Sequence, residues 1–113
     1  MRRIVPLAAL LAPLAALLAL LAAPLRGHAA DAQVEVGHNR LAPTQVEIAA
    51  GDSVTFHNVD QMPGGHTVAA DDGSFSSPPL AKDQSWSHTF EKPGSFGVHI
   101  KEHPGAKATI EVK

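Results

Sequence analysis

An all-β fold, a Greek-key β-sandwich of about seven short strands, is predicted for residues 30–113. Three observations predict it. Short stretches of alternating apolar and polar residues recur along this part of the chain. Turns rich in Gly, Pro and Asp separate them about every 8–12 residues, and no apolar stripe of helical period is present. Two sheets packed face to face would bury the apolar face of every strand.

The strands are expected where apolar residues occupy alternate positions. Residues 33–36 and 45–48 alternate in this way, and a Gly-Asp turn follows them. The next strand, 54–57, places Val54 and Phe56 on one face. The remaining strands are expected at 66–69, 86–90, 96–100 and 108–112.

Residues 1–29 are predicted to be a secretory signal peptide. A basic start precedes an apolar run of Leu, Ala and Pro, and small residues occupy the positions that a signal peptidase reads. Cleavage is expected after Ala29, with Ala32 as the alternative. The run is also long enough to span a bilayer, so an uncleaved anchor is the other interpretation. With cleavage, the domain 30–113 is periplasmic or secreted and has no membrane contact.

The composition of the domain excludes several functions. After Ala29 it has six basic and eleven acidic residues, a net charge of −5 with His neutral. Nucleic-acid binding needs a high density of Lys and Arg, so it is not expected. The chain has no Cys, and it shows no nucleophile elbow, triad spacing or phosphate-binding loop, so no enzyme is predicted. Six histidines in so short a domain instead suggest a metal site.

Six segments, in order, resemble the cupredoxins, the small blue copper proteins, and most of all their amicyanin and pseudoazurin branch. Among them are GDSVTFHN at 51–58, MPGGHTV at 62–68 and GSFGVHIKEHPGA at 94–106. The second of these resembles the loop of the family's first copper-binding histidine, and the third resembles its main ligand loop. The resemblance implies a cupredoxin-like sandwich over nearly all of 34–113.

The resemblance implies ligands residue by residue. The two family histidines fall on His66 and His103, whereas the Cys position holds Ile100 and the Met position holds Ala106. Asn58 matches the Asn that joins the two ligand loops in the family. A blue site needs a thiolate, so no blue site is expected here. Two imidazoles still suit copper or another transition metal.

His66 and His103 are therefore the predicted metal ligands. Three further residues are candidates for additional ligands: Met62 through its thioether, Glu102 through an oxygen, and His99. Strand alternation is expected to turn His99 away from the face of the ligands.

The remaining histidines of the domain have simpler interpretations. His57 is expected to face solvent from a strand, and His38 to lie in a surface loop. His88 shares a strand face with Trp86 and Phe90 and is expected to be packed.

The sequence thus predicts an exported, cupredoxin-like metal-binding protein that handles copper and lacks a blue site. Its expected partners are the metal ion and a periplasmic redox or metal-transfer protein. Electron transfer, as in the family, is one alternative. A metal-free interaction module that kept the fold and lost the site is the other.

Overall fold

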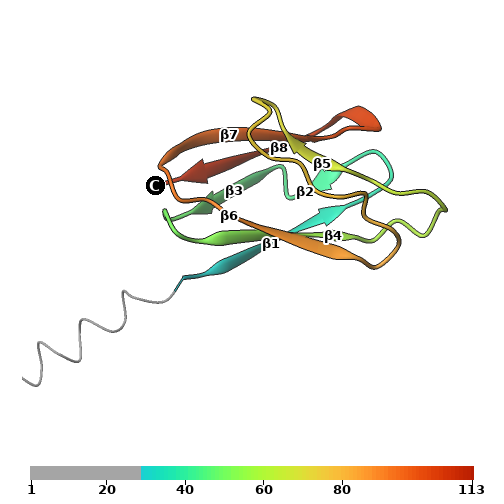
Figure 1. Ribbon diagram of the computed structural model, residues 1–113, viewed down its shortest axis with the longest axis horizontal. Coiled ribbons are helices and arrows are strands. Elements are labelled where there is room, and N and C mark those ends of the chain that lie inside the picture. The colour runs from blue at the N-terminus through green and yellow to red at the C-terminus, as the bar shows by residue number, and fades with distance from the viewer. Residues whose placement is uncertain (1–28) are drawn as a thin grey trace, which may run out of the picture.

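The computed structural model describes residues 29–113, which form two four-stranded β-sheets packed face to face (Figure 1). Apart from Ala29, the predicted signal peptide lies outside the described residues. Over residues 29–113 no helix is long and apolar enough to cross a membrane. The predicted all-β sandwich is confirmed.

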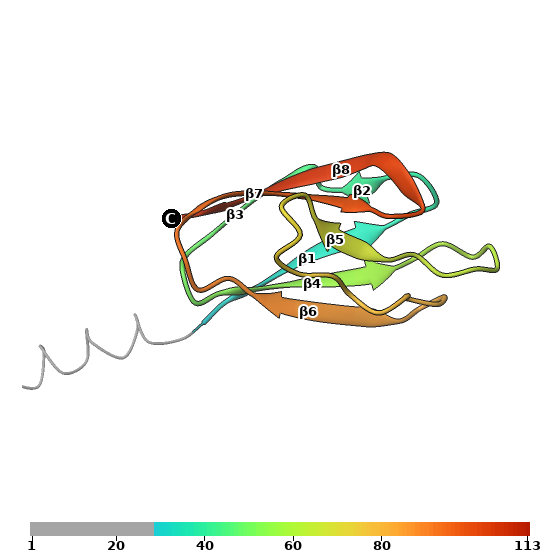
Figure 2. The same ribbon diagram turned by 45° about the horizontal axis from the view of Figure 1, so that its top comes forward.

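The strands of each sheet are far apart in the sequence. One sheet has the order β2-β1-β4-β6 and the other the order β3-β8-β7-β5. The pairs β1·β4 and β3·β8 are parallel, and the other pairs are antiparallel. Figure 2 shows the two layers with the connections that pass between them. The strands are β1 Asp31–Val36, β2 Leu41–Ala42, β3 Gln45–Ile48, β4 Ser53–Asn58, β5 Val68–Ala70, β6 Ser85–Thr89, β7 Gly94–Ile100 and β8 His103–Val112.

The core lies between the sheets and is built by strand alternation. In β4 the side chains of Val54, Phe56 and Asn58 are buried, whereas their neighbours are partly exposed. Phe56 is fully buried and stacks on Trp86 of β6, with ring centroids 6.2 Å apart. The same alternation in β8 buries every second residue from Ala106 onward. Each sheet therefore contributes one apolar face to a shared core.

The observed strands differ from the predicted ones mainly at their ends. The two-residue strand β2 was not predicted because two residues are too few to show alternation. His66 forms only an isolated bridge with Leu80, so β5 begins at Val68. β8 begins as early as His103, because that residue pairs with Ile100 across a tight turn.

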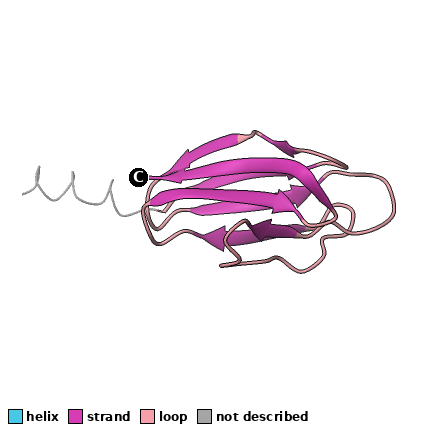
Figure 3. Cartoon of the chain, turned by 90° about the horizontal axis from the view of Figure 1, so that it is seen from above, coloured by secondary structure: helices cyan, strands magenta, loops and turns pink. Residues whose placement is uncertain are grey.

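Three connections meet at one end of the sandwich. They are the β1–β2 turn, the long β4–β5 loop and the β7–β8 turn, and they lie at the end opposite the C-terminus (Figure 2). In Figure 3 the sandwich is seen from above, with loops collected at that end. This end holds the predicted ligands His66 and His103.

Candidate metal centre

Three histidine rings cluster at the loop end of the sandwich. His66 and His103, predicted from the sequence, have ring centroids 5.6 Å apart. The ring of His38, from the β1–β2 turn, lies 4.7 Å from that of His103 and 6.0 Å from that of His66. The structure therefore brings the two predicted ligands together and adds a third imidazole beside them.

His66 is held rigidly and is nearly enclosed. It is 5% exposed, and its backbone exchanges two hydrogen bonds with Leu80, at 3.0 and 2.8 Å. Its Nε2 lies 2.8 Å from Oδ2 of Asp60, whereas its buried Nδ1 has no hydrogen-bond partner among the described residues. An unsatisfied buried nitrogen is unfavourable by about 1–3 kcal/mol, which makes this atom a candidate metal ligand.

Asp60 faces two of the three rings. Its Oδ2 lies 2.8 Å from Nε2 of His66 and 3.1 Å from Nδ1 of His38. Its Oδ1 accepts a hydrogen bond from the backbone N–H of Met62, and its own N–H donates to Asn58 Oδ1. The hydrogen bond to His66, with those from Met62 and His38, lowers the pKa of Asp60 to about 2. Asp60 is therefore a carboxylate at neutral pH.

The lowered pKa of Asp60 predicts an acid-dependent stability. A carboxyl with a pKa near 2 in the folded state and 3.8 otherwise binds more protons when the chain unfolds. We therefore expect the metal-free protein to lose stability as the pH falls from about 4 to about 2. Urea unfolding at several pH values measures this loss.

The Asp60→Asn variant should lose that part of the pH dependence, because it removes the titrating group. The exposed Glu91→Gln variant is the matched control and should keep the wild-type dependence. An Asp60→Asn variant with the full wild-type acid transition would contradict the assignment.

The two positions that match the Cys and Met copper ligands of the cupredoxins hold apolar, buried residues. Ile100 is 0% exposed and pairs with Val68 and His103 on the neighbouring strands. Ala106 is 3% exposed and belongs to the same core. Neither side chain offers a lone pair, so the donor set does not fit a blue copper site. His38, Asp60 and His66 each place one possible ligand atom within 4.8 Å of the others, a group of nitrogen and oxygen donors that could hold a copper or zinc ion without thiolate.

The three candidates for additional ligands lie in different settings. Met62 is an exposed side chain of the β4–β5 loop, at 59%. Both oxygens of Glu102 accept hydrogen bonds from Thr67, one from the backbone N–H at 2.7 Å and one from Oγ1 at 2.9 Å. His99 Nδ1 pairs with Asp71 at 2.6 Å. None of the three belongs to the cluster of rings.

Glu102 joins the two histidine loops. Its bonds to Thr67 tie the β7–β8 turn to the residue after His66. The resemblance implied this role for Asn58, but Asn58 instead donates to the carbonyl of Leu80 at 2.8 Å and braces Asp60.

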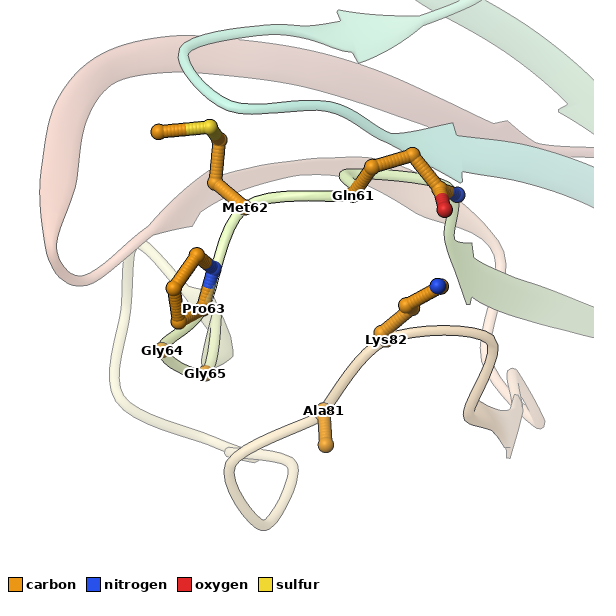
Figure 4. Close-up of a pocket in the computed structure, with 7 residues that line it drawn as sticks. All are labelled: Gln61, Met62, Pro63, Gly64, Gly65, Ala81 and Lys82. Carbon is orange, nitrogen blue, oxygen red and sulfur yellow. The ribbon is translucent and has the colours of Figure 1, made fainter.

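The two glycines before His66 do not push it outward. Gly64 has a φ of 104°, which a glycine adopts without strain, and the turn returns the chain to the sandwich. A Cβ at Gly65 would lie 3.2 Å from the side chain of Pro79, so the chain passes close to that loop. Next to this turn is a cavity of about 490 Å³ (Figure 4). Its lining residues are Gln61, Met62, Pro63, Gly64, Gly65, Ala81 and Lys82.

Sequence reasoning missed His38 and Asp60 as members of the site. His38 does lie in an exposed turn, with its side chain 63% exposed, but it also contacts Asp60. The two residues are brought together by the parallel pairing of β1 and β4, in which Val36 is opposite Asn58. Each lies two residues beyond that pair. No spacing in the sequence reveals this pairing.

The other histidines of residues 29–113 lie outside the cluster. His57 Nδ1 lies 2.6 Å from Ser85 Oγ on the neighbouring strand. His88 stacks on Phe75 with ring centroids 4.0 Å apart, and burial lowers its pKa. The predicted packing of His88 is confirmed.

Comparisons with known proteins point to one family, although no family model matches. Amicyanin from Paracoccus denitrificans is 26% identical over 83 residues, which cover 71% of this chain and 63% of that protein. The chain thus spans less than two thirds of that relative. Amicyanin-alpha from Methylorubrum extorquens is 28% identical over 90 residues, which cover 75% of this chain and 74% of that protein.

Several solved structures of copper proteins are also similar to this chain. A purple cupredoxin from Nitrosopumilus maritimus superposes with a TM-score of 0.63 at 28% identity, over 74% of this chain and all of the other. A copper-containing nitrite reductase from Thermus scotoductus gives a TM-score of 0.65 at 28% identity, but only over 22% of its length. An oxidised amicyanin variant gives 0.65 at 25% identity, over 73% of this chain and 81% of the other.

Proposed function

Because the chain is a member of the cupredoxin family without a cysteine, we propose that it is an exported copper-handling protein that binds its metal ion through His66 and His103. The family supports a copper-related role, in metal binding or electron transfer. Export rests on the predicted signal peptide of residues 1–29. The protein acts as a carrier or store of metal and forms no blue site.

The observation that carries this proposal is the buried Nδ1 of His66, which has no hydrogen-bond partner among residues 29–113, in a ring whose centroid lies 5.6 Å from that of His103. A metal ion would satisfy this nitrogen, which no described side chain does. Rigid backbone pairing with Leu80 holds His66 in place, and Glu102 ties its loop to the turn that carries His103. Little ordering is then needed on binding, which favours affinity.

The residues at this end of the sandwich have different roles in the proposed metal site. His66 and His103 supply imidazole nitrogens, which suit copper. Ile100 and Ala106 are buried and apolar, so neither position supplies a ligand. His103 is only partly buried, so the ion has a path to solvent. An accessible site suits uptake and release of an ion.

Electron transfer is the second candidate, and the likeness to the amicyanins favours it. The absence of a thiolate argues against electron transfer. Cu(I) and Cu(II) prefer different coordination geometries, so without a thiolate the copper site would have to reorganise at each transfer of an electron. A metal-free interaction module would need neither histidine for its function. These readings make different predictions for metal binding.

Calorimetric titration of the protein with Cu(II), and with Cu(I) under reducing conditions, tests the proposal. We expect one ion per chain and the loss of this binding in the His66→Ala/His103→Ala variant. Binding should also weaken in acid, since protons compete with metal for neutral imidazole.

The His57→Ala/His99→Ala variant is the matched control, because it removes two histidines outside the cluster. It should bind like the wild type. Equal binding by the wild type and the His66→Ala/His103→Ala variant would remove these residues from the site. No binding by the wild type would favour the metal-free module.

A further inference from the structure

Asp60 has a role of its own at the proposed metal site. We infer that Asp60 selects the ligating nitrogen of His66: its carboxylate holds the ring proton on Nε2 and keeps the lone pair of Nδ1 free for the metal ion, without binding the ion itself. This inference rests on the proposed function and deepens it, because it names the ligating atom and the residue that positions it.

The carboxylate of Asp60 is fixed in place. Its side chain is only 8% exposed, its Oδ1 accepts a hydrogen bond from the N–H of Met62 at 3.0 Å, and its own N–H donates to Asn58 Oδ1 at 2.9 Å. The carbonyl of Leu80 accepts from the Asn58 side chain at 2.8 Å and from the backbone N–H of His66 at 3.0 Å. The backbone therefore holds the carboxylate and the ring of His66 in one arrangement.

The contact between Asp60 and His66 determines the tautomer of the ring. An ionised carboxylate only accepts hydrogen bonds, so the Nε2 that lies 2.8 Å from its Oδ2 must donate. A neutral imidazole carries one N–H, so the lone pair is left on Nδ1. This Nδ1 is the buried atom that has no hydrogen-bond partner among residues 29–113. A carboxylate that accepts from the other ring nitrogen commonly orients a metal-binding histidine.

The ring of His103 lies within reach of an ion bound to His66. A metal–nitrogen bond of about 2.0–2.1 Å places an imidazole centroid about 3.2 Å from the ion, so two rings on one ion are at most roughly 6.4 Å apart. The centroids of His66 and His103 are 5.6 Å apart. One ion can therefore contact both rings.

His38 is a second partner of Asp60 rather than a further ligand of this ion. Its Nδ1 lies 3.1 Å from the same Oδ2, and its ring centroid is 6.0 Å from that of His66. Since both rings present one nitrogen to the same oxygen, their other nitrogens point away from each other. The free nitrogens of His38 and His66 therefore cannot share an ion.

An ion placed between Asp60 and the two nitrogens that face it would give a different site. It would replace both hydrogen bonds and bind Nε2 of His66, so that Nδ1 would carry the proton. A buried N–H without an acceptor is unfavourable, which argues against this arrangement. The two arrangements differ in the nitrogen of His66 that binds the ion.

The nitrogen that binds is measured on the wild-type protein. Long-range ¹H–¹⁵N correlation spectra of the metal-free protein are expected to show His66 protonated on Nε2. With Zn(II) added, the proton should stay on Nε2 and the ion should bind Nδ1. A proton on Nδ1, or Zn(II) bound to Nε2, would overturn the inference. This measurement needs no variant to fold.

Variants then test the role of Asp60. In folded Asp60→Ala the preference for the Nε2 proton of His66 should disappear, and Zn(II) should bind about 10–100-fold more weakly. His38→Ala should keep the tautomer and change the affinity by a few-fold at most. The matched control is Asp71→Ala, which removes a carboxylate that lies 2.6 Å from His99, outside the cluster. It should change neither the tautomer nor the affinity.

The outcomes separate this inference from the proposed function. The wild-type tautomer and affinity in Asp60→Ala, with binding still lost in His66→Ala/His103→Ala, would overturn the role of Asp60 and leave the proposed function standing. Equally large losses of affinity in Asp60→Ala and His38→Ala would mean that both residues bind the ion, which would also overturn the inference. A wild-type protein that binds neither Zn(II) nor copper would overturn the proposed function and this inference with it.

Discussion

The Ile100→Cys/Ala106→Met variant is expected to form a copper complex with intense absorption at ~600 nm, which the wild-type complex lacks. A short copper–thiolate bond is the source of such a band, and the wild-type chain has no Cys. The two substitutions supply the thiolate and the weak axial thioether of a blue site. The measurement is a visible spectrum after addition of Cu(II).

The fold places position 100 for this purpose. Ile100 is the register partner of His103, and side chains of directly opposed residues lie on the same face of the sheet, with Cβ atoms about 4.5–5.5 Å apart. His66 lies beside His103, and Ala106 is buried in the same core. A larger side chain at position 106 is expected to cost roughly 1–3 kcal/mol through overpacking. The variant must therefore be shown to be folded.

The matched control is Ile100→Ser/Ala106→Met, which has nearly the same shape and no thiol. It should bind copper without the intense band. A colourless copper complex of the folded Ile100→Cys/Ala106→Met variant would mean that the loops do not converge on position 100 as they do in the family.

Phe56→Ala is expected to destabilise the domain by about 3–5 kcal/mol. The ring is 0% exposed, lies in the middle of β4 and stacks on Trp86. Its removal leaves a cavity between the sheets, which a close-packed sandwich fills only in part. Domains of this size are stable by only about 5–15 kcal/mol, so the variant should approach the limit of folding. Urea unfolding of the wild type and the variant measures the difference.

The stability of Phe56→Ala is compared with that of two control variants. Phe56→Leu keeps most of the volume and should be less destabilising than Phe56→Ala. Met62→Ala truncates an exposed side chain and should change the stability by no more than about 0.5 kcal/mol. A loss below about 1 kcal/mol for Phe56→Ala would mean that Phe56 is not at the centre of the core.

Most of the sandwich could be predicted because its strands alternate. Val54 and Phe56 point inward from β4, and the same pattern marks β1, β3 and β8. Strand ends were predicted less well, since a bridge such as that of His66 with Leu80 depends on a loop that is distant in the sequence.

Only those site residues that lie within segments similar to the cupredoxins could be predicted from the sequence. His66 and His103 lie within recognisable segments, and the structure brings their rings together. His38 and Asp60 lie outside such segments, and their meeting depends on the parallel register of β1 with β4. The contacts of Glu102 also depend on the tertiary fold, because its partner Thr67 is 35 residues away.

The most direct test of the metal site is a crystal structure of the protein with added Zn(II) or Cu(II), with anomalous diffraction recorded at the absorption edge of the metal. The proposal predicts a single strong anomalous peak about 2.0–2.1 Å from Nδ1 of His66 and from a ring nitrogen of His103. A peak elsewhere on the protein, or no peak in a crystal saturated with metal, would contradict it.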